Sequence, residues 1–171
     1  KLFQNNIYVF SPKGDVIELP INATPIDFAY SIHSQIGDKC VAAKINGKLQ
    51  PLKTILQNGD QVEILTSDQS QPSFIWERFA VTSKVKSHLR RFIRSKKIDE
   101  HISFGKEILL NQFKNENIEY NENAILNILS DFNCKNIDNL YEQIGSGTIT
   151  AMAVLKKIFP ELNFSKKKKK T

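Results

Sequence analysis

The sequence has 171 residues, of which 40% are hydrophobic and 25% charged, as in a folded globular protein rather than a disordered one. No apolar run approaches the roughly 18–20 residues that a membrane span requires, so we expect no transmembrane helix. The net charge of +6 is uneven: residues 82–97 carry seven Lys or Arg and no Asp or Glu, whereas residues 98–165 carry five against ten.

The first 66 residues predict one compact module with the element order β-β-α-β-β-β. Runs of branched and aromatic residues, separated by turn residues, indicate its strands. The expected strands are Ile7–Phe10, Asp15–Leu19, Val41–Ile45, Lys48–Leu52 and Gln61–Thr66. Asn46-Gly47 is a strong signal for a hairpin turn. One helix packed across a small mixed sheet would bury the apolar face of both, so a ubiquitin-like β-grasp domain is predicted.

The helix of this module is expected over Thr24–Gly37. Thr24 suits the N-cap and Pro25 the first helical position, while Gly37 suits the left-handed residue that ends many helices. His33 falls in the apolar sector of the helical wheel, which favours a histidine in the core or at its rim. Its place in the last turn would also let the ring leave the sheet and contact an unpaired base or a phosphate. The residues leave both interpretations open.

A change of pattern follows the module, because residues 67–73 are polar, contain Pro72 and indicate a domain boundary. We expect a domain over residues 1–67, a linker over 68–72, a helical domain over 73–164 and a basic tail or linker over 165–171. Helical periodicity predicts helices at about 82–97, 98–115, 121–132, 137–144 and 148–159. Trp76 and Phe79 are expected to anchor the helical domain to the sheet, with Arg78 exposed. The predicted fold class is α+β.

The segment 82–97 combines an apolar side with a basic side. The candidate phosphate contacts on the basic side are Lys84, Lys86, Arg90, Arg91, Arg94 and Lys97. Because no acidic residue of the segment balances them, this side favours binding to the phosphate backbone of a nucleic acid, without selectivity for its nucleotide sequence. An acidic protein would be attracted equally, and a merely solvated face is the simplest alternative.

The chemistry of catalysis is missing from the sequence. The three histidines show no HExxH spacing, and Gly47-Lys48 lacks the preceding glycine of a phosphate-binding loop. Cys40 and Cys134 stand alone, which favours buried free thiols in a reducing cytoplasm over a disulfide or a metal site. We therefore expect a cytoplasmic, non-catalytic segment that binds or senses, without metal or cofactor.

Several stretches resemble known proteins. VFSPKGDVIELP, ATPIDFAYSIHSQIGDKCVAAKINGKLQPL and LQNGDQVEILTS resemble the TGS domain. PSFIWERFAVTSKVKSHLRRFIRSKK, ISFGKEIL and GSGTITAMAVLKKIFP resemble the helical domain that follows it in RelA/SpoT homologues, the (p)ppGpp synthetase/hydrolases of the bacterial stringent response. Since there is no starting Met, we expect a segment of a longer polypeptide.

The resemblance implies a regulatory segment of a GTP pyrophosphokinase and (p)ppGpp hydrolase whose catalytic domains lie N-terminal to it. In ribosome-associated members the TGS domain contacts the 3′ CCA end of an uncharged tRNA, and His33 matches the motif's histidine, with Lys39 and Lys44 as further contacts. In SpoT-like members the same domain is implicated in binding acyl carrier protein. Many members have Gly-His-Arg-Cys where this sequence has Gly37-Asp38-Lys39-Cys40, so Lys39 lacks the planar guanidinium and Asp38 adds an anion beside any phosphate.

Overall fold

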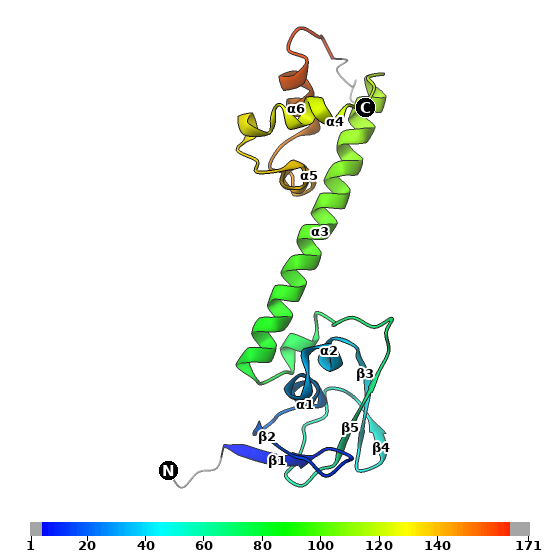
Figure 1. The fold of residues 1–171 in the computed structure, drawn as a ribbon, viewed down its shortest axis with the longest axis vertical. Coiled ribbons are helices and arrows are strands. Elements are labelled where there is room, and N and C mark those ends of the chain that lie inside the picture. The colour runs from blue at the N-terminus through cyan, green and yellow to red at the C-terminus, as the bar shows by residue number, and fades with distance from the viewer. Residues whose placement is uncertain (1–4, 165–171) are drawn as a thin grey trace, which may run out of the picture. The chain divides into compact units, whose positions relative to one another are not determined.

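The computed structural model describes residues 5–164, and the chain forms two compact units that divide between Ile93 and Arg94 (Figure 1). The described strands all lie in the first unit, which confirms the α+β class. That unit contains β1 (Asn6–Phe10), β2 (Val16–Pro20), α1 (Pro25–Ile32), α2 (Ser34–Asp38), β3 (Cys40–Ile45), β4 (Lys48–Gln50), β5 (Val62–Thr66) and the 3-10 helix η1 (Trp76–Arg78). The tail predicted at 165–171 lies outside the described residues, and the predicted domain limits stay predictions.

The strands form a β1–β2 hairpin and a three-stranded antiparallel sheet in the order β4-β3-β5. A parallel bridge between Phe10 and Gln61 connects the two sheets. The β3–β4 turn is the predicted hairpin, since Asn46 and Gly47 both have positive φ, 53° and 82°, as a type I′ turn requires. Strand β4 ends at Gln50, before the predicted Leu52, because Pro51 has no backbone N–H to continue the ladder.

The single helix predicted over Thr24–Gly37 is wrong, because the chain forms two helices with His33 between them. His33 has extended backbone angles (φ −165°, ψ 145°), so it ends α1 and caps α2. Gly37 lies inside α2 and not at a left-handed helix end. A Cβ at position 37 would lie 2.3 Å from Cδ1 of Tyr30, so glycine is required here by close packing.

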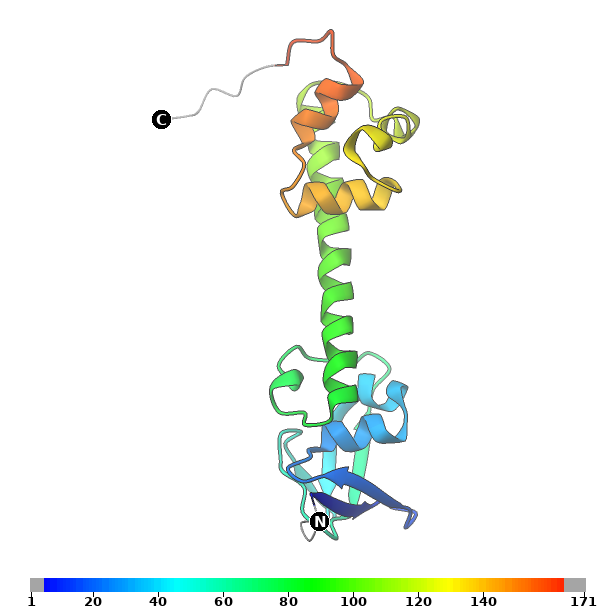
Figure 2. The same ribbon diagram turned by 90° about the vertical axis from the view of Figure 1, so that its left-hand side faces the viewer.

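The apolar side of α1 packs against the sheets and against residues that follow them. Ile26 and Ala29 share a buried cluster with Cys40 of β3 and with Trp76, Ala80, Val85 and Leu89. Figure 2 shows α1 and α2 beside each other and beside the start of the next helix. Trp76 is 7% exposed and Phe79 packs on the same cluster, while Arg78 is exposed as predicted. This cluster lies within the first unit, so the anchoring of the helical domain stays a prediction.

One continuous helix, α3 (Ser83–Asn115), occupies the region where two were predicted, at 82–97 and 98–115. The reason is that residues 94–104 contain neither proline nor glycine, so nothing interrupts the backbone hydrogen bonds. Among residues 5–164, no helix combines the length and hydropathy needed to cross a bilayer.

The second unit packs short helices against the later part of α3. They are α4 (Glu122–Leu126), the 3-10 helix η2 (Leu129–Phe132), α5 (Ile137–Gly145) and α6 (Ala151–Ile158). The helix predicted over 121–132 is therefore two shorter elements. A Cβ at Gly105 of α3 would lie 1.7 Å from the carbonyl oxygen of Tyr141, so α3 and α5 cross in direct backbone contact. Gly147, at φ 85°, makes the predicted turn between α5 and α6.

Candidate functional site

His33 is exposed at the junction of α1 and α2, so the buried interpretation of this residue is wrong. Its Nδ1 accepts a hydrogen bond of 3.0 Å from the backbone N–H of Gln35, which is how it caps α2. In the neutral ring the proton therefore sits on Nε2. That Nε2–H has no partner among residues 5–164, so the ring presents a donor and an aromatic face to solvent.

The other predicted contacts of this module do not gather around His33. Lys39 follows α2 and forms an exposed ion pair of 3.1 Å with Asp68. Lys44 lies in β3 between the buried residues Ala43 and Ile45. Because side chains alternate along a strand, Lys44 points to the face of the sheet opposite the core. The structure thus places Lys39 near the end of α2 and sets Lys44 apart.

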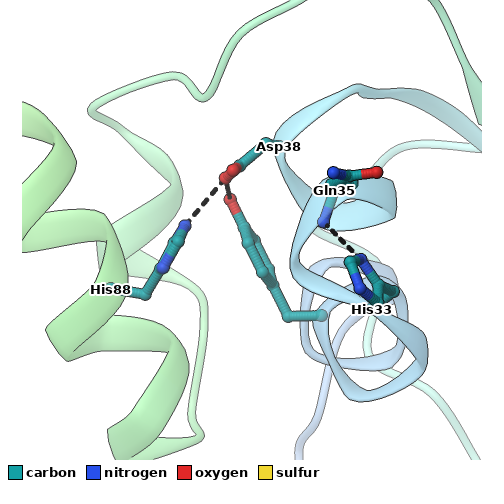
Figure 3. A network of polar contacts seen from close by, with 5 residues as sticks. His33, Gln35, Asp38 and His88 are labelled. Carbon is teal, nitrogen blue, oxygen red and sulfur yellow. Dashed lines mark hydrogen bonds and ion pairs between the residues drawn. The ribbon is translucent and has the colours of Figure 1, made fainter.

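Asp38 holds together three helices. Its Oδ1 accepts a hydrogen bond from the Tyr30 hydroxyl of α1 and another from His88 Nε2 of α3, each 2.8 Å long. Figure 3 shows Asp38 and His88 turned toward each other, apart from the His33–Gln35 contact. Burial, and then the hydrogen bond to Asp38, raise the pKa of Tyr30 well above 10, so its hydroxyl stays protonated and donates. The Asp38 carboxylate is thus engaged by Tyr30 and His88, and its effect on a nearby phosphate stays a prediction.

Asp27 is the second carboxylate that organises this region. It is 1% exposed, and its oxygens accept hydrogen bonds from the backbone N–H groups of Thr24 (2.9 Å), Val81 (3.1 Å) and Thr82 (3.0 Å). One side chain thereby caps α1 and fixes the residues that lead into α3. The sequence analysis missed this role of Asp27, because nothing local signals a contact 54 residues away.

The basic side of α3 borders a cleft of about 350 Å³ within the first unit. Lys84, His88 and Arg91 of α3 line it. The other lining residues are Glu18, Leu19, Pro20, Asp27, Tyr30, Ser31, Ser34, Thr82 and Val85. Lys84 and Arg91 are exposed and form no ion pair within the described part of the chain.

The remaining predicted cations are placed differently. Arg90 forms an ion pair with Glu77 of η1, so the expectation that no carboxylate balances the basic segment is wrong for this residue. Lys86 is half-buried outside the cleft lining, while Arg94 and Lys97 are exposed on α3 in the second unit. Burial raises the pKa of the Cys40 thiol to about 11, so the thiol is protonated and unreactive. No group of three His, Cys, Asp or Glu side chains within residues 5–164 could hold a metal ion.

Comparison with known families agrees with this arrangement. The TGS domain matches residues 7–66, which include His33 and Asp38. The RelA/SpoT AH domain matches residues 92–159, which contain most of the second unit. The chain belongs to the RelA/SpoT family. The TGS match contains the β-grasp strands, and the AH match contains the helices α4, α5 and α6.

Several curated members of this family are similar to the chain. A GTP pyrophosphokinase of Myxococcus xanthus is 37% identical over 164 residues, and the alignment covers 94% of this chain and 22% of that protein. The GTP pyrophosphokinase rsh of Brucella ovis is 36% identical over 161 residues, and the alignment again covers 94% of this chain and 22% of that protein. A GTP pyrophosphokinase of Escherichia coli (strain K12) is 39% identical over 153 residues, which is 87% of this chain and 20% of that protein. The chain thus spans about a fifth of the length of these relatives.

Proposed function

We propose that this segment regulates a (p)ppGpp synthetase/hydrolase of the stringent response by binding the 3′ end of an uncharged tRNA on the ribosome, in the cytoplasm. The observation that supports this most is the exposed His33 ring in the TGS domain, with its Nε2–H unpartnered in the described chain. Single-stranded RNA ends are commonly held by stacking of unpaired bases on aromatic rings and by hydrogen bonds to their edges. His33 offers both at one point.

Lys84 and Arg91 give the proposal its electrostatic part. Both are exposed at the cleft, and neither is neutralised by an ion pair within residues 5–164. Phosphate contacts of this kind contribute affinity without sequence selection. Lys39 and Arg90, already paired with Asp68 and Glu77, would have to exchange a carboxylate for a phosphate. They are therefore weaker candidates than Lys84 and Arg91.

Regulation requires that tRNA binds one state of the longer protein more tightly than another. The segment would contribute this difference in affinity, while the GTP pyrophosphokinase and hydrolase reactions would belong to other parts of the longer polypeptide. The purified 171-residue chain should show no turnover of GTP or (p)ppGpp. Measurable turnover would contradict this division of roles.

His33→Asn tests the site, because asparagine is a strong N-cap residue and preserves the cap of α2 while removing the ring. We expect affinity for uncharged tRNA to fall about tenfold, since stacking on one base contributes roughly 1–3 kcal/mol. Binding is measured by fluorescence anisotropy with labelled tRNA, and tRNA lacking its terminal CCA is the matched ligand. Equal affinity of the variant and the wild type for intact tRNA would overturn the assignment of His33.

Acyl carrier protein is the second candidate partner. Ile32, next to His33, is 43% exposed, and an apolar side chain beside a polar contact suits a protein interface better than an RNA end. The two partners are separated by salt: RNA affinity should fall steeply between 50 and 200 mM salt, and a docked protein should be less sensitive. Salt-insensitive binding of acyl carrier protein, without tRNA binding, would favour this candidate.

A further inference from the structure

We propose that His88 is a positioning residue: through Asp38 it holds α2, and with it the His33 ring at the start of α2, in the binding arrangement. The effect on α2 is independent of the proposed function, whereas the effect on partner binding rests on it.

The first argument is the weakness of α2 as an isolated element. It has five residues, and a helix of this length is not stable without tertiary contacts. Ser34 and Gln35 are exposed, so little of its first turn is buried. Its contacts lie toward the other end, where Gly37 packs on the Tyr30 ring and Asp38 accepts hydrogen bonds from two other helices.

The second argument is the geometry of the Asp38 carboxylate. A single oxygen, Oδ1, accepts both the Tyr30 hydroxyl and His88 Nε2 at 2.8 Å, and the two rings lie 5.1 Å apart between centroids. The donor on α1 keeps its proton, as shown above. His88 is the donor that reaches Asp38 from outside α1 and α2, so this contact connects α2 to α3.

The third argument is that Asp38 is the carboxylate that His88 contacts. Glu18 and Asp27 line the same cleft as His88, but Asp27 is already satisfied by backbone N–H groups. The 2.8 Å contact to Asp38 is therefore the dominant interaction.

Hydrogen exchange of the α2 backbone amides in the 171-residue chain, corrected for intrinsic rates, tests the positioning role. We expect His88→Leu to speed exchange at residues 34–38 about tenfold, as loss of a hydrogen bond to a charged group implies. His88→Gln retains a donor and should preserve most of the protection. Ser87→Ala, the neighbouring exposed position, is the control and should change nothing.

A second variant, Asp38→Asn, keeps the proposal testable if the His88→Leu protein does not fold. Asp38→Asn removes the charge of the acceptor and should give faster exchange in the same way as His88→Leu. If either folded variant leaves exchange at residues 34–38 at the wild-type value, or if His88→Gln loses as much protection as His88→Leu, the positioning role is overturned.

Binding of uncharged tRNA then separates this inference from the proposed function. His88→Leu should weaken binding several-fold in the wild type and add no further loss in a His33→Asn background, because it acts through His33. Faster α2 exchange without any change in tRNA affinity would support the hold on α2 and contradict the proposed role of His33. Additive losses in the double variant would contradict the link between the two histidines.

Discussion

At the scale of single residues, two carboxylates determine how the first unit is arranged. Asp27 connects the start of α1 with the residues that lead into α3, and Asp38 connects the end of α2 with α1 and α3. Apart from Thr24, three residues before Asp27, their partners are 8 to 55 residues away in sequence. Local patterns identify acidic residues but not such partners, so the sequence predicted His33 as a candidate contact and missed the residues that position it.

Asp27→Asn is expected to lower the free energy of unfolding by about 1.5–3 kcal/mol. A buried charged acceptor of several backbone N–H groups becomes a neutral amide, and its NH₂ group faces other donors. Urea unfolding measures the effect. Asp99→Asn, an exposed position on α3, is the control and should stay within about 0.5 kcal/mol. Similar small changes in both variants would show that Asp27 is dispensable.

At the scale of elements, the β3–β4 hairpin has a local cause in its own turn residues, whereas the break between α1 and α2 depends on packing between the two helices. The Asn46-Gly47 turn forms where it was predicted, because positive φ at both positions is a property of those two residues. The interruption between α1 and α2 was missed, since the sequence 24–37 has no proline or glycine near His33. What ends α1 is the capping of α2 by His33 together with the packing of Gly37 on Tyr30.

Gly37→Ala tests this packing between α1 and α2. The added methyl would lie 2.3 Å from Cδ1 of Tyr30, so the ring or α2 must move. We expect a loss of about 1–3 kcal/mol in unfolding free energy, as for other overpacked sites. In addition, the Tyr30 and His88 ring resonances should shift in NMR spectra. Gln35→Ala, exposed in the same helix, should leave both unchanged; a stable Gly37→Ala protein with unshifted resonances would show that this contact is not tight.

At the scale of the whole molecule, the chain has separate cores in its two units. The first unit buries its apolar residues around α1 and the sheets, while the second has its own cluster, which includes Leu109, Phe113 and Leu140. The two sets share no buried residue. Each unit is therefore expected to retain its packing when the core of the other is damaged.

Leu140→Ala tests this independence. Leu140 is fully buried in α5, so its truncation should cost the second unit about 2–5 kcal/mol. Trp76, the single tryptophan, lies in the first unit and reports on it by fluorescence, whereas circular dichroism reports on helices of both. We expect the helical signal to fall at lower urea while the Trp76 midpoint changes little. A joint shift of both signals would show that the units unfold as one.

The sequence by itself determined the order of the strands, the hairpin and the identity of the family. These depend on local propensities and on motifs that are continuous in the chain. Only the tertiary structure decided that His33 is exposed, that Arg90 is paired with Glu77, and that Asp38 joins Tyr30 to His88. The physical reason is that exposure and charge pairing depend on which distant residues meet, and no periodicity within one segment carries that information.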